Sequence, residues 1–178
     1  MSEANAGTVI LCWGSKVSQR FRDRVVEICR ELGAVPDQLM ACMAFESNLT
    51  FSPRIRNAAG SGAVGLIQFM PDTAHALGTS TEELLMMTAE DQLEWVRKYF
   101  LHSKGKLKTL SDLYMAILWP AGVGKPESYV LFDQADPKHP KRYLQNKGLD
   151  FNKDGKITKA EASAKVTETM RLGFHYTN

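Results

Sequence analysis

The sequence predicts a mainly α-helical protein. Apolar residues recur every three or four positions over most of the 178 residues, and glycine and proline interrupt this pattern at intervals typical of helix ends. No set of alternating segments indicates a sheet. The composition, 44% hydrophobic and 24% charged, is ordinary for a globular protein, and the length suffices for one domain with a small annex.

Charge and cysteine content exclude several classes of protein. The net charge of +2 is too small to indicate a nucleic-acid partner, although it would not repel an anionic polymer. No uninterrupted apolar run reaches the roughly 20 residues that span a bilayer, and the first residues lack the basic region of a signal peptide. We therefore expect no membrane insertion and no signal peptide. Cys12, Cys29 and Cys42 lie in apolar surroundings and are expected to be reduced core residues.

The first half of the chain contains two expected helices and a long loop. In residues 17–32, apolar side chains repeat at helical spacing, and Gly33 offers a stop. Pro36 suits the first turn of a second helix, which we expect to continue to Glu46. Residues 52–65 are rich in Pro, Asn, Gly and Ser and are expected to form a loop or an irregular hairpin.

Shorter helices are expected in the second half. They are predicted at residues 71–77, 81–87, 89–101 and 111–118, with a last helix ending near residue 172. Residues 133–140 are polar and contain two prolines, which is typical of a boundary. We therefore divide the chain into a helical domain, residues 1–132, and a C-terminal segment, residues 133–178, that packs on it.

The second helix carries a carboxylate where apolar side chains are expected. Leu39, Met43 and Glu46 recur at helical spacing, which places Glu46 on an apolar face. A carboxylate that loses water has a raised pKa, as a general acid needs near neutral pH. The alternative is a half-exposed glutamate at a helix end, paired with Arg54 or Arg56.

A glycine-rich segment follows this helix. Residues 60–71 read GSGAVGLIQFMP, and their three glycines allow the backbone to approach a ligand closely. Gln68 is an amide among apolar residues, able to donate and accept hydrogen bonds to a sugar hydroxyl or acetamido group. Taken alone, the segment would be a glycine-rich turn before a helix.

Together these segments resemble the soluble lytic transglycosylase family and its goose-type lysozyme relatives. The family signature is Glu-Ser, then Gly-Leu-x-Gln-x-Met-Pro, then Tyr-Asn-Ala-Gly. This chain has Glu46-Ser47, then GLIQFMP at 65–71, then LWPAGVG at 118–124. The likeness covers roughly residues 17–124, and the first two motifs together are specific.

The third motif departs from the family pattern. Trp119 stands where a tyrosine is usual, and Pro120 stands where an asparagine is usual. The phenol that lies near the catalytic glutamate in the family is therefore absent here, because an indole N–H donates but scarcely accepts hydrogen bonds. Trp119 could still stack on a sugar ring.

The resemblance implies a lysozyme-like fold that cleaves the β-1,4 bond between N-acetylmuramic acid and N-acetylglucosamine in peptidoglycan. Glu46 is then the catalytic acid, and the implied substrate contacts are Ser47, Gln68, Phe69 and Trp119. In a transglycosylase, Glu46 next acts as base while the muramic acid 6-hydroxyl attacks C1, leaving a 1,6-anhydro end.

A hydrolase would commonly need a second carboxylate. No Asp or Glu lies between Ser47 and Pro71, which favours the transglycosylase route. A distant acid such as Asp72, Asp91 or Glu127 remains the alternative.

Residues 150–161, DFNKDGKITKAE, match the EF-hand loop pattern, whose hard oxygen ligands suit Ca²⁺. The expected ligands are Asp150, Asn152, Asp154, the carbonyl of Lys156, and Glu161. Thr158 and Glu161 would also form a capping box, which could start the last helix without a metal. Because sensor EF-hands occur in pairs and this chain has one such loop, we expect a structural calcium ion.

The wording of several segments, such as AFES and ILWPAGVGKP, looks most like phage-encoded members of the family. This implies a monomeric endolysin or virion-associated muramidase that acts on bacterial peptidoglycan during lysis or wall penetration. It would be found in the host cytoplasm and then the periplasm, or on the virion. The alternative is a non-catalytic wall-binding or virion structural protein that keeps the fold.

Overall fold

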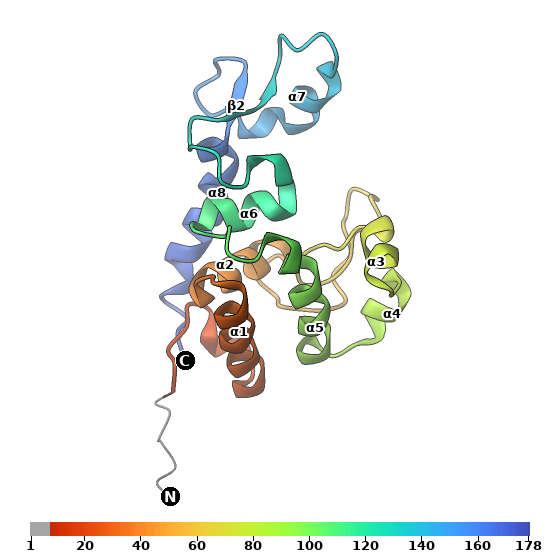
Figure 1. Cartoon of the computed structure of the whole chain (residues 1–178), viewed down its shortest axis with the longest axis vertical. Helices are drawn as coiled ribbons and strands as arrows, with labels where there is room; N and C mark the ends of the chain where they lie inside the picture. Colours follow the sequence, from red (N-terminus) through yellow and green to blue (C-terminus); the bar gives the residue numbers. More distant parts are fainter. Residues whose placement is uncertain (1–7) are drawn as a thin grey trace, which may run out of the picture.

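The computed structural model describes residues 8–178 and shows a body of α-helices with one small two-stranded sheet (Figure 1). The helices are α1 (Gln19–Leu32), α2 (Pro36–Glu46), α3 (Pro71–Leu77), α4 (Thr81–Met86), α5 (Ala89–Phe100), α6 (Leu110–Leu118), α7 (Pro140–Asn146) and α8 (Lys159–Gly173). Short 3₁₀ turns are η1 (Gly14–Lys16), η2 (Leu101–Ser103), η3 (Pro120–Gly122) and η4 (Lys147–Leu149). The predicted mainly helical class is confirmed.

Two expectations concern the start of the chain. The absence of a signal peptide and the beginning of the 1–132 domain both involve residues 1–7, which lie outside the described residues. No helix formed by residues 8–178 combines the length and the apolar character needed to cross a membrane.

Local sequence sets most helix ends. Proline occupies the first turn of α2, α3 and α7, where a missing N–H costs nothing. Five helices begin at a hydroxyl that accepts a hydrogen bond from the backbone N–H three residues later: Ser18, Ser80, Thr88, Thr109 and Thr158. Gly33 and Gly78 end α1 and α3 in the left-handed conformation, at φ 71° and 89°.

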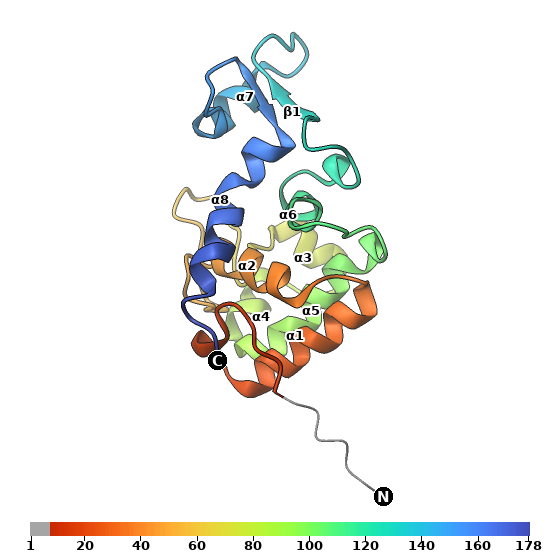
Figure 2. The same ribbon diagram turned by 90° about the vertical axis from the view of Figure 1, so that its left-hand side faces the viewer.

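Helix α2 lies at the centre of the core. It packs against α1, α6 and α8 (Figures 1 and 2), and residues 39–44 are all buried. Six consecutive buried residues cover every side of a helix, so α2 has no solvated face there and the expected amphipathic pattern is wrong. Cys12, Cys29 and Cys42 are buried free thiols, as predicted.

The C-terminal part contains the only strands among the described residues. Strand β1 (Val130–Asp133) pairs antiparallel with β2 (Lys156–Thr158), with Phe132 opposite Ile157. Neither strand was expected, because segments of three or four residues are too short to show a period of two. The division placed after residue 132 falls inside β1. Figure 2 shows β1 and α7 at one end of the molecule, with α8 running from there along the body.

A buried ion pair joins α8 to α6. The Lys159 side chain is 1% exposed, and its ammonium donates to the Asp112 carboxylate and to the Lys125 carbonyl, the latter at 2.7 Å. Asp112 also accepts from the Gly124 N–H at 2.8 Å. Burial would raise the pKa of Asp112, but the hydrogen bonds from Lys159 and Gly124 outweigh it and hold that pKa below its ordinary value.

We expect Lys159→Met to lower the free energy of unfolding by about 3–5 kcal/mol, because it leaves the Asp112 carboxylate buried without its partner. Chemical denaturation followed by circular dichroism measures the change. Lys165→Met, at an exposed position of the same helix, is the control and should change stability by less than about 0.5 kcal/mol. Equal effects of the two substitutions would contradict a stabilising role for the pair.

Candidate active site

The chain turns sharply where α2 ends. Glu46 is the last residue of α2, and three of the next five residues have left-handed backbones: Asn48, Leu49 and Phe51, at φ 52°, 64° and 52°. Each such non-glycine conformation costs of order 1 kcal/mol, and strain of this kind clusters at functional sites.

Ser47 holds this strained turn. Its hydroxyl accepts a hydrogen bond from the Phe51 N–H at 2.9 Å, and its side chain is fully buried. The expected contact between Ser47 and substrate is therefore corrected: the hydroxyl points into the turn. It shapes the site by fixing the backbone that follows Glu46.

Gln92 of α5 anchors the glycine-rich segment, and sequence reasoning missed it. Its buried side-chain oxygen accepts from the Leu66 N–H at 2.8 Å, and its amide donates to the carbonyls of Pro53 and Leu84. Gly65 is required here, since a Cβ at this residue would lie 2.3 Å from the Gln92 oxygen. A signal existed in the sequence: Gln92 lies four residues before Val96, on the apolar face of its helix.

Gln68 and Phe69 have different roles. Gln68 is half-buried with φ 55°, and its amide nitrogen donates to the Gly65 carbonyl at 3.1 Å. No hydrogen bond among residues 8–178 uses its amide oxygen, which stays available to a ligand. Phe69 is 1% exposed and packs edge-on against Tyr99, at 6.1 Å between ring centres. The expected substrate contact of Phe69 is therefore corrected to a core contact.

The Glu46 carboxylate is poorly hydrated and unpaired. Burial raises its pKa from 4.5 to about 7. Its place at the carboxyl end of α2 acts in the same direction, because the helix dipole there disfavours a negative charge. No ion pair of residues 8–178 involves Glu46, so the alternative of a pair with Arg54 or Arg56 is wrong.

Two tyrosines lie within electrostatic reach of Glu46. Burial, and next the charge of Glu46, raise the pKa of Tyr99 to about 12 and the pKa of Tyr114 above its usual range. Tyr99 belongs to α5 and Tyr114 to α6. Because Phe69 packs on Tyr99, the glycine-rich segment and the end of α2 meet around these rings.

Trp119 contacts the C-terminal part of the chain. Its ring packs against Phe132 of β1 at 5.2 Å, and the Arg142 guanidinium of α7 lies 4.9 Å from its centre. One face of the indole is thus covered by a cation, which restricts the stacking on sugar that the sequence suggested. Trp119 joins the third motif to β1 and α7.

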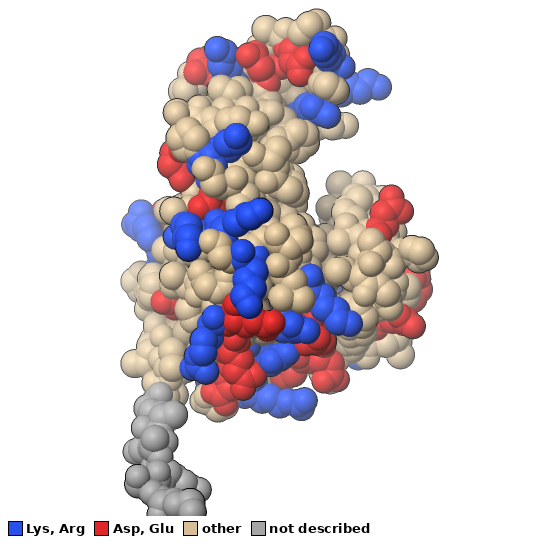
Figure 3. Space-filling model, viewed as in Figure 1, with Lys and Arg blue, Asp and Glu red and all other residues tan. Residues whose placement is uncertain are grey.

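The surface is hollowed between two lobes. Figure 3 shows a notch between the upper lobe, which carries β1 and α7, and the right-hand lobe, which carries α3. Uncharged side chains form most of its visible walls, and basic side chains lie on the upper lobe beside its opening. The carboxyl end of α2 lies toward its base, below α6 (Figure 1).

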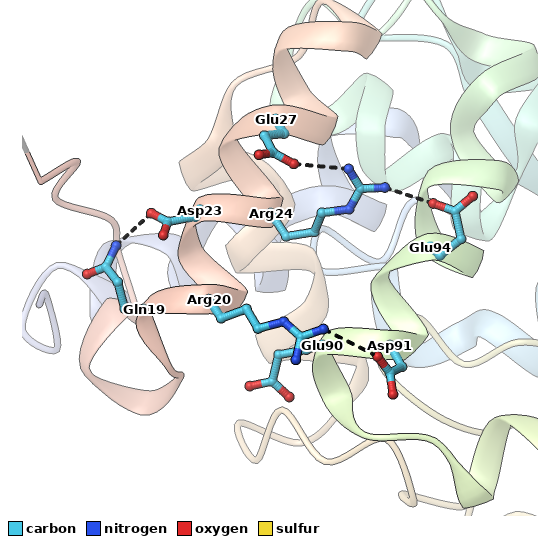
Figure 4. Close-up of a pocket in the computed structure, with 8 residues that line it drawn as sticks. All are labelled: Gln19, Arg20, Asp23, Arg24, Glu27, Glu90, Asp91 and Glu94. Carbon is cyan, nitrogen blue, oxygen red and sulfur yellow. Dashed lines mark hydrogen bonds and ion pairs between the residues drawn. The ribbon is translucent and has the colours of Figure 1, made fainter. Parts of the chain in front are cut away.

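A separate open cavity of 680 Å³ lies between α1 and α5, away from the motif residues (Figure 4). It is lined by charged side chains that pair with one another, such as Arg24 with Glu94 at 2.8 Å and Arg20 with Asp91 at 3.7 Å. Asp91 is therefore engaged on this side. Exposed ion pairs of this kind explain the cavity without a ligand.

The loop at 150–161 has the backbone of an EF-hand loop. Gly155 at its sixth position has φ 84°, and the Asp150 carboxylate accepts from the N–H groups of Asp154 and Gly155. Glu161 completes a capping box with Thr158, and its second carboxylate oxygen is buried without a partner. Within residues 8–178 no three acidic, His or Cys side chains already converge as a metal site. The residues thus suit calcium in type and backbone, and their side chains would have to turn inward to bind it.

We expect Glu46→Gln to stabilise the protein at alkaline pH. The folded state holds the Glu46 proton more tightly than the unfolded state, so this contribution to stability is present below pH 4.5 and is lost as pH rises through about 7. A glutamine cannot ionise, and the variant should gain roughly 1–3 kcal/mol at pH 8 relative to wild type, with the gain shrinking toward pH 4.

Denaturation curves at both pH values measure this gain, and Glu168→Gln, on the exposed side of α8, is the control. A difference between Glu46→Gln and wild type that does not change with pH would contradict the raised pKa.

Comparison with known proteins was made on the whole chain. Residues 28–110 match the family model of the transglycosylase SLT domain, slightly less than half of the 178 residues. The matched segment includes Glu46 and Gln68 and ends at the start of α6, before Trp119. No curated protein matches the chain. The match supports placing the helical body of this chain in the transglycosylase SLT family of the lysozyme-like superfamily.

Proposed function

We propose that this chain is a lytic transglycosylase that cleaves the β-1,4 bond between N-acetylmuramic acid and N-acetylglucosamine in peptidoglycan. The observation that carries the proposal is a glutamate whose pKa of about 7 leaves it largely protonated at neutral pH, in a segment that matches the transglycosylase SLT domain. The family match supports activity of the lytic transglycosylase type.

Glu46 serves as acid and then as base. It donates its proton to the glycosidic oxygen as the bond from that oxygen to C1 breaks, and N-acetylglucosamine leaves as an alcohol. The resulting carboxylate takes the proton of the muramic acid 6-hydroxyl while that oxygen bonds to C1. No water is consumed, the product ends in a 1,6-anhydro ring, and Glu46 regains its proton.

The surroundings of Glu46 favour this one-carboxylate route over hydrolysis. Its neighbours are the two tyrosines, whereas Asp91 pairs with Arg20 between α1 and α5 and Glu127 accepts a hydrogen bond from Ser111. An inverting hydrolase needs a second carboxylate roughly 6.5–9.5 Å from the first. Mass spectrometry separates the two reactions, since anhydro and reducing ends differ by one water.

A second candidate is a peptidoglycan-binding protein without catalysis, of the wall-binding or virion structural kind. The departure at Trp119 favours it, because the ring is used to hold β1 and α7. The chemical competence of Glu46 favours the enzyme. The substitution described below separates them.

We also propose a phage origin and a monomeric enzyme that acts in lysis or in wall penetration. The support is the resemblance of the wording of residues 43–47 and 117–126 to phage-encoded members of the family. Proteomic analysis of purified virions from the source phage tests the virion form, since an endolysin would be absent from washed particles. A gene embedded among bacterial wall-synthesis genes would contradict the phage origin.

We propose further that the 150–161 loop binds one calcium ion that stabilises the fold. The support is the oxygen donor set, the left-handed Gly155 and the unpartnered buried oxygen of Glu161. Asp150, Asn152, Asp154, the Lys156 carbonyl and Glu161 would hold the ion. The ion would neutralise the clustered carboxylates and fix the start of α8.

Glu46→Gln should abolish release of soluble muropeptides from purified peptidoglycan, with a loss of about 10²-fold or more, because an amide cannot deliver the proton. A matched control is Glu82→Gln, an exposed glutamate of α4. If Glu46→Gln keeps more than about a tenth of the wild-type rate, another group supplies the acid. If wild type itself binds peptidoglycan but releases nothing, the binding-protein alternative holds.

Calcium should raise the melting temperature and a chelator should lower it. A ligand that binds only the folded state contributes about 2.7 kcal/mol at a hundredfold excess over its dissociation constant. Glu161→Gln keeps an acceptor for the Thr158 cap but loses the charge, and it should stop responding to calcium. Glu168→Gln, seven residues further along α8, should respond like wild type. Identical melting curves with calcium and with chelator would refute the site.

A further inference from the structure

Two polar groups near the end of α2 have no hydrogen-bond partner among residues 8–178: the Glu46 carboxylate and the Tyr114 hydroxyl. The Tyr114 side chain is 6% exposed, and its ring stands edge-on to Phe45 with ring centres 5.7 Å apart. Phe45 directly precedes Glu46, and α6 packs against α2. The two unpaired groups therefore face one region.

The other aromatic hydroxyl in this region is already committed. Tyr99 donates to the Ala116 carbonyl at 2.6 Å, a bond that joins α5 to α6. Trp119 is turned toward Phe132 and Arg142. Tyr114 is thus the neighbouring side chain with a free O–H, and burying such a donor is costly unless it is hydrogen-bonded in some state of the site.

We propose that Tyr114 is a positioning residue of the active site, whose hydroxyl donates a hydrogen bond, directly or through one water, to the Glu46 carboxylate once that group has released its proton. The inference rests on the proposed function and deepens it. During the first step, negative charge develops on Glu46 in a poorly hydrated place, and a fixed donor stabilises it. The bond also holds the carboxylate oriented until it takes the proton of the 6-hydroxyl.

The phenol is suited to this role at all working pH values. Burial and the charge of Glu46 keep its pKa above the usual range, so it remains a neutral donor. The other titratable groups near Glu46 are Cys42 on α2 and Tyr99 on α5, which are neutral at these pH values because their pKa values are also raised. The ionisation of Glu46 itself is therefore the change that a pH profile would report.

Tyr114→Phe tests the proposal, because it keeps the ring on Phe45 and removes only the hydroxyl. We expect turnover on purified peptidoglycan to fall about tenfold or more on the acidic plateau. The alkaline limb of the pH–rate profile should move upward by about one pH unit, since the ionised form has lost a donor. The melting temperature should stay near that of wild type, because no existing hydrogen bond is removed.

Tyr99→Phe is the matched control. It breaks the bond to the Ala116 carbonyl, so it should lower the melting temperature while leaving the alkaline limb in place. A Tyr114→Phe profile identical to wild type, or an equal shift of the limb in Tyr99→Phe, would overturn the proposal. If Glu46→Gln is inactive and Tyr114→Phe is unaffected, the inference fails and the proposed function stands. If Glu46→Gln is active, the proposed function itself has failed.

Discussion

Residues 39–44 of α2 are packed on all sides by α1, α6 and α8, and this packing sets the properties of the site. A helix without a solvated face carries its last residue to the edge of the core, so Glu46 loses most of its water without gaining a counter-charge. Burial and the helix carboxyl end both disfavour its anion. The acid is thus produced by the fold, at some expense in stability whenever the site ionises.

The remaining elements hold the partners of Glu46 in place. Gln92 fixes the segment that presents Gln68, and Ser47 fixes the strained turn after α2. On the other wall, Lys159 joins the start of α8 to Asp112 of α6, and Asp112 in turn binds the Gly124 N–H. The calcium-type loop therefore ends directly on a residue that supports the third motif. Through these contacts the stability of the C-terminal part bears on the helix that carries Tyr114.

Much of this arrangement could be predicted from the sequence. Pro36, Pro71, Gly33 and Gly78 mark helix ends through local backbone chemistry, and the burial of Glu46 follows from its apolar helix. The parts that could not be predicted depend on tertiary contacts. The direction of the Ser47 hydroxyl, the burial of Phe69 and the pairing of β1 with β2 are decided by neighbours distant in sequence, as is the use of Trp119 by Phe132 and Arg142.

The central claim is that the fold keeps Glu46 protonated near neutral pH, and direct titration of this carboxyl tests it. Carboxyl carbons of glutamate can be labelled with ¹³C and followed by NMR from pH 3 to 9, with the Glu46 signal assigned by its loss in Glu46→Gln. The account predicts a midpoint at about pH 7 for this signal. A midpoint near the ordinary 4.5 would show a hydrated, ionised carboxylate and would contradict the account.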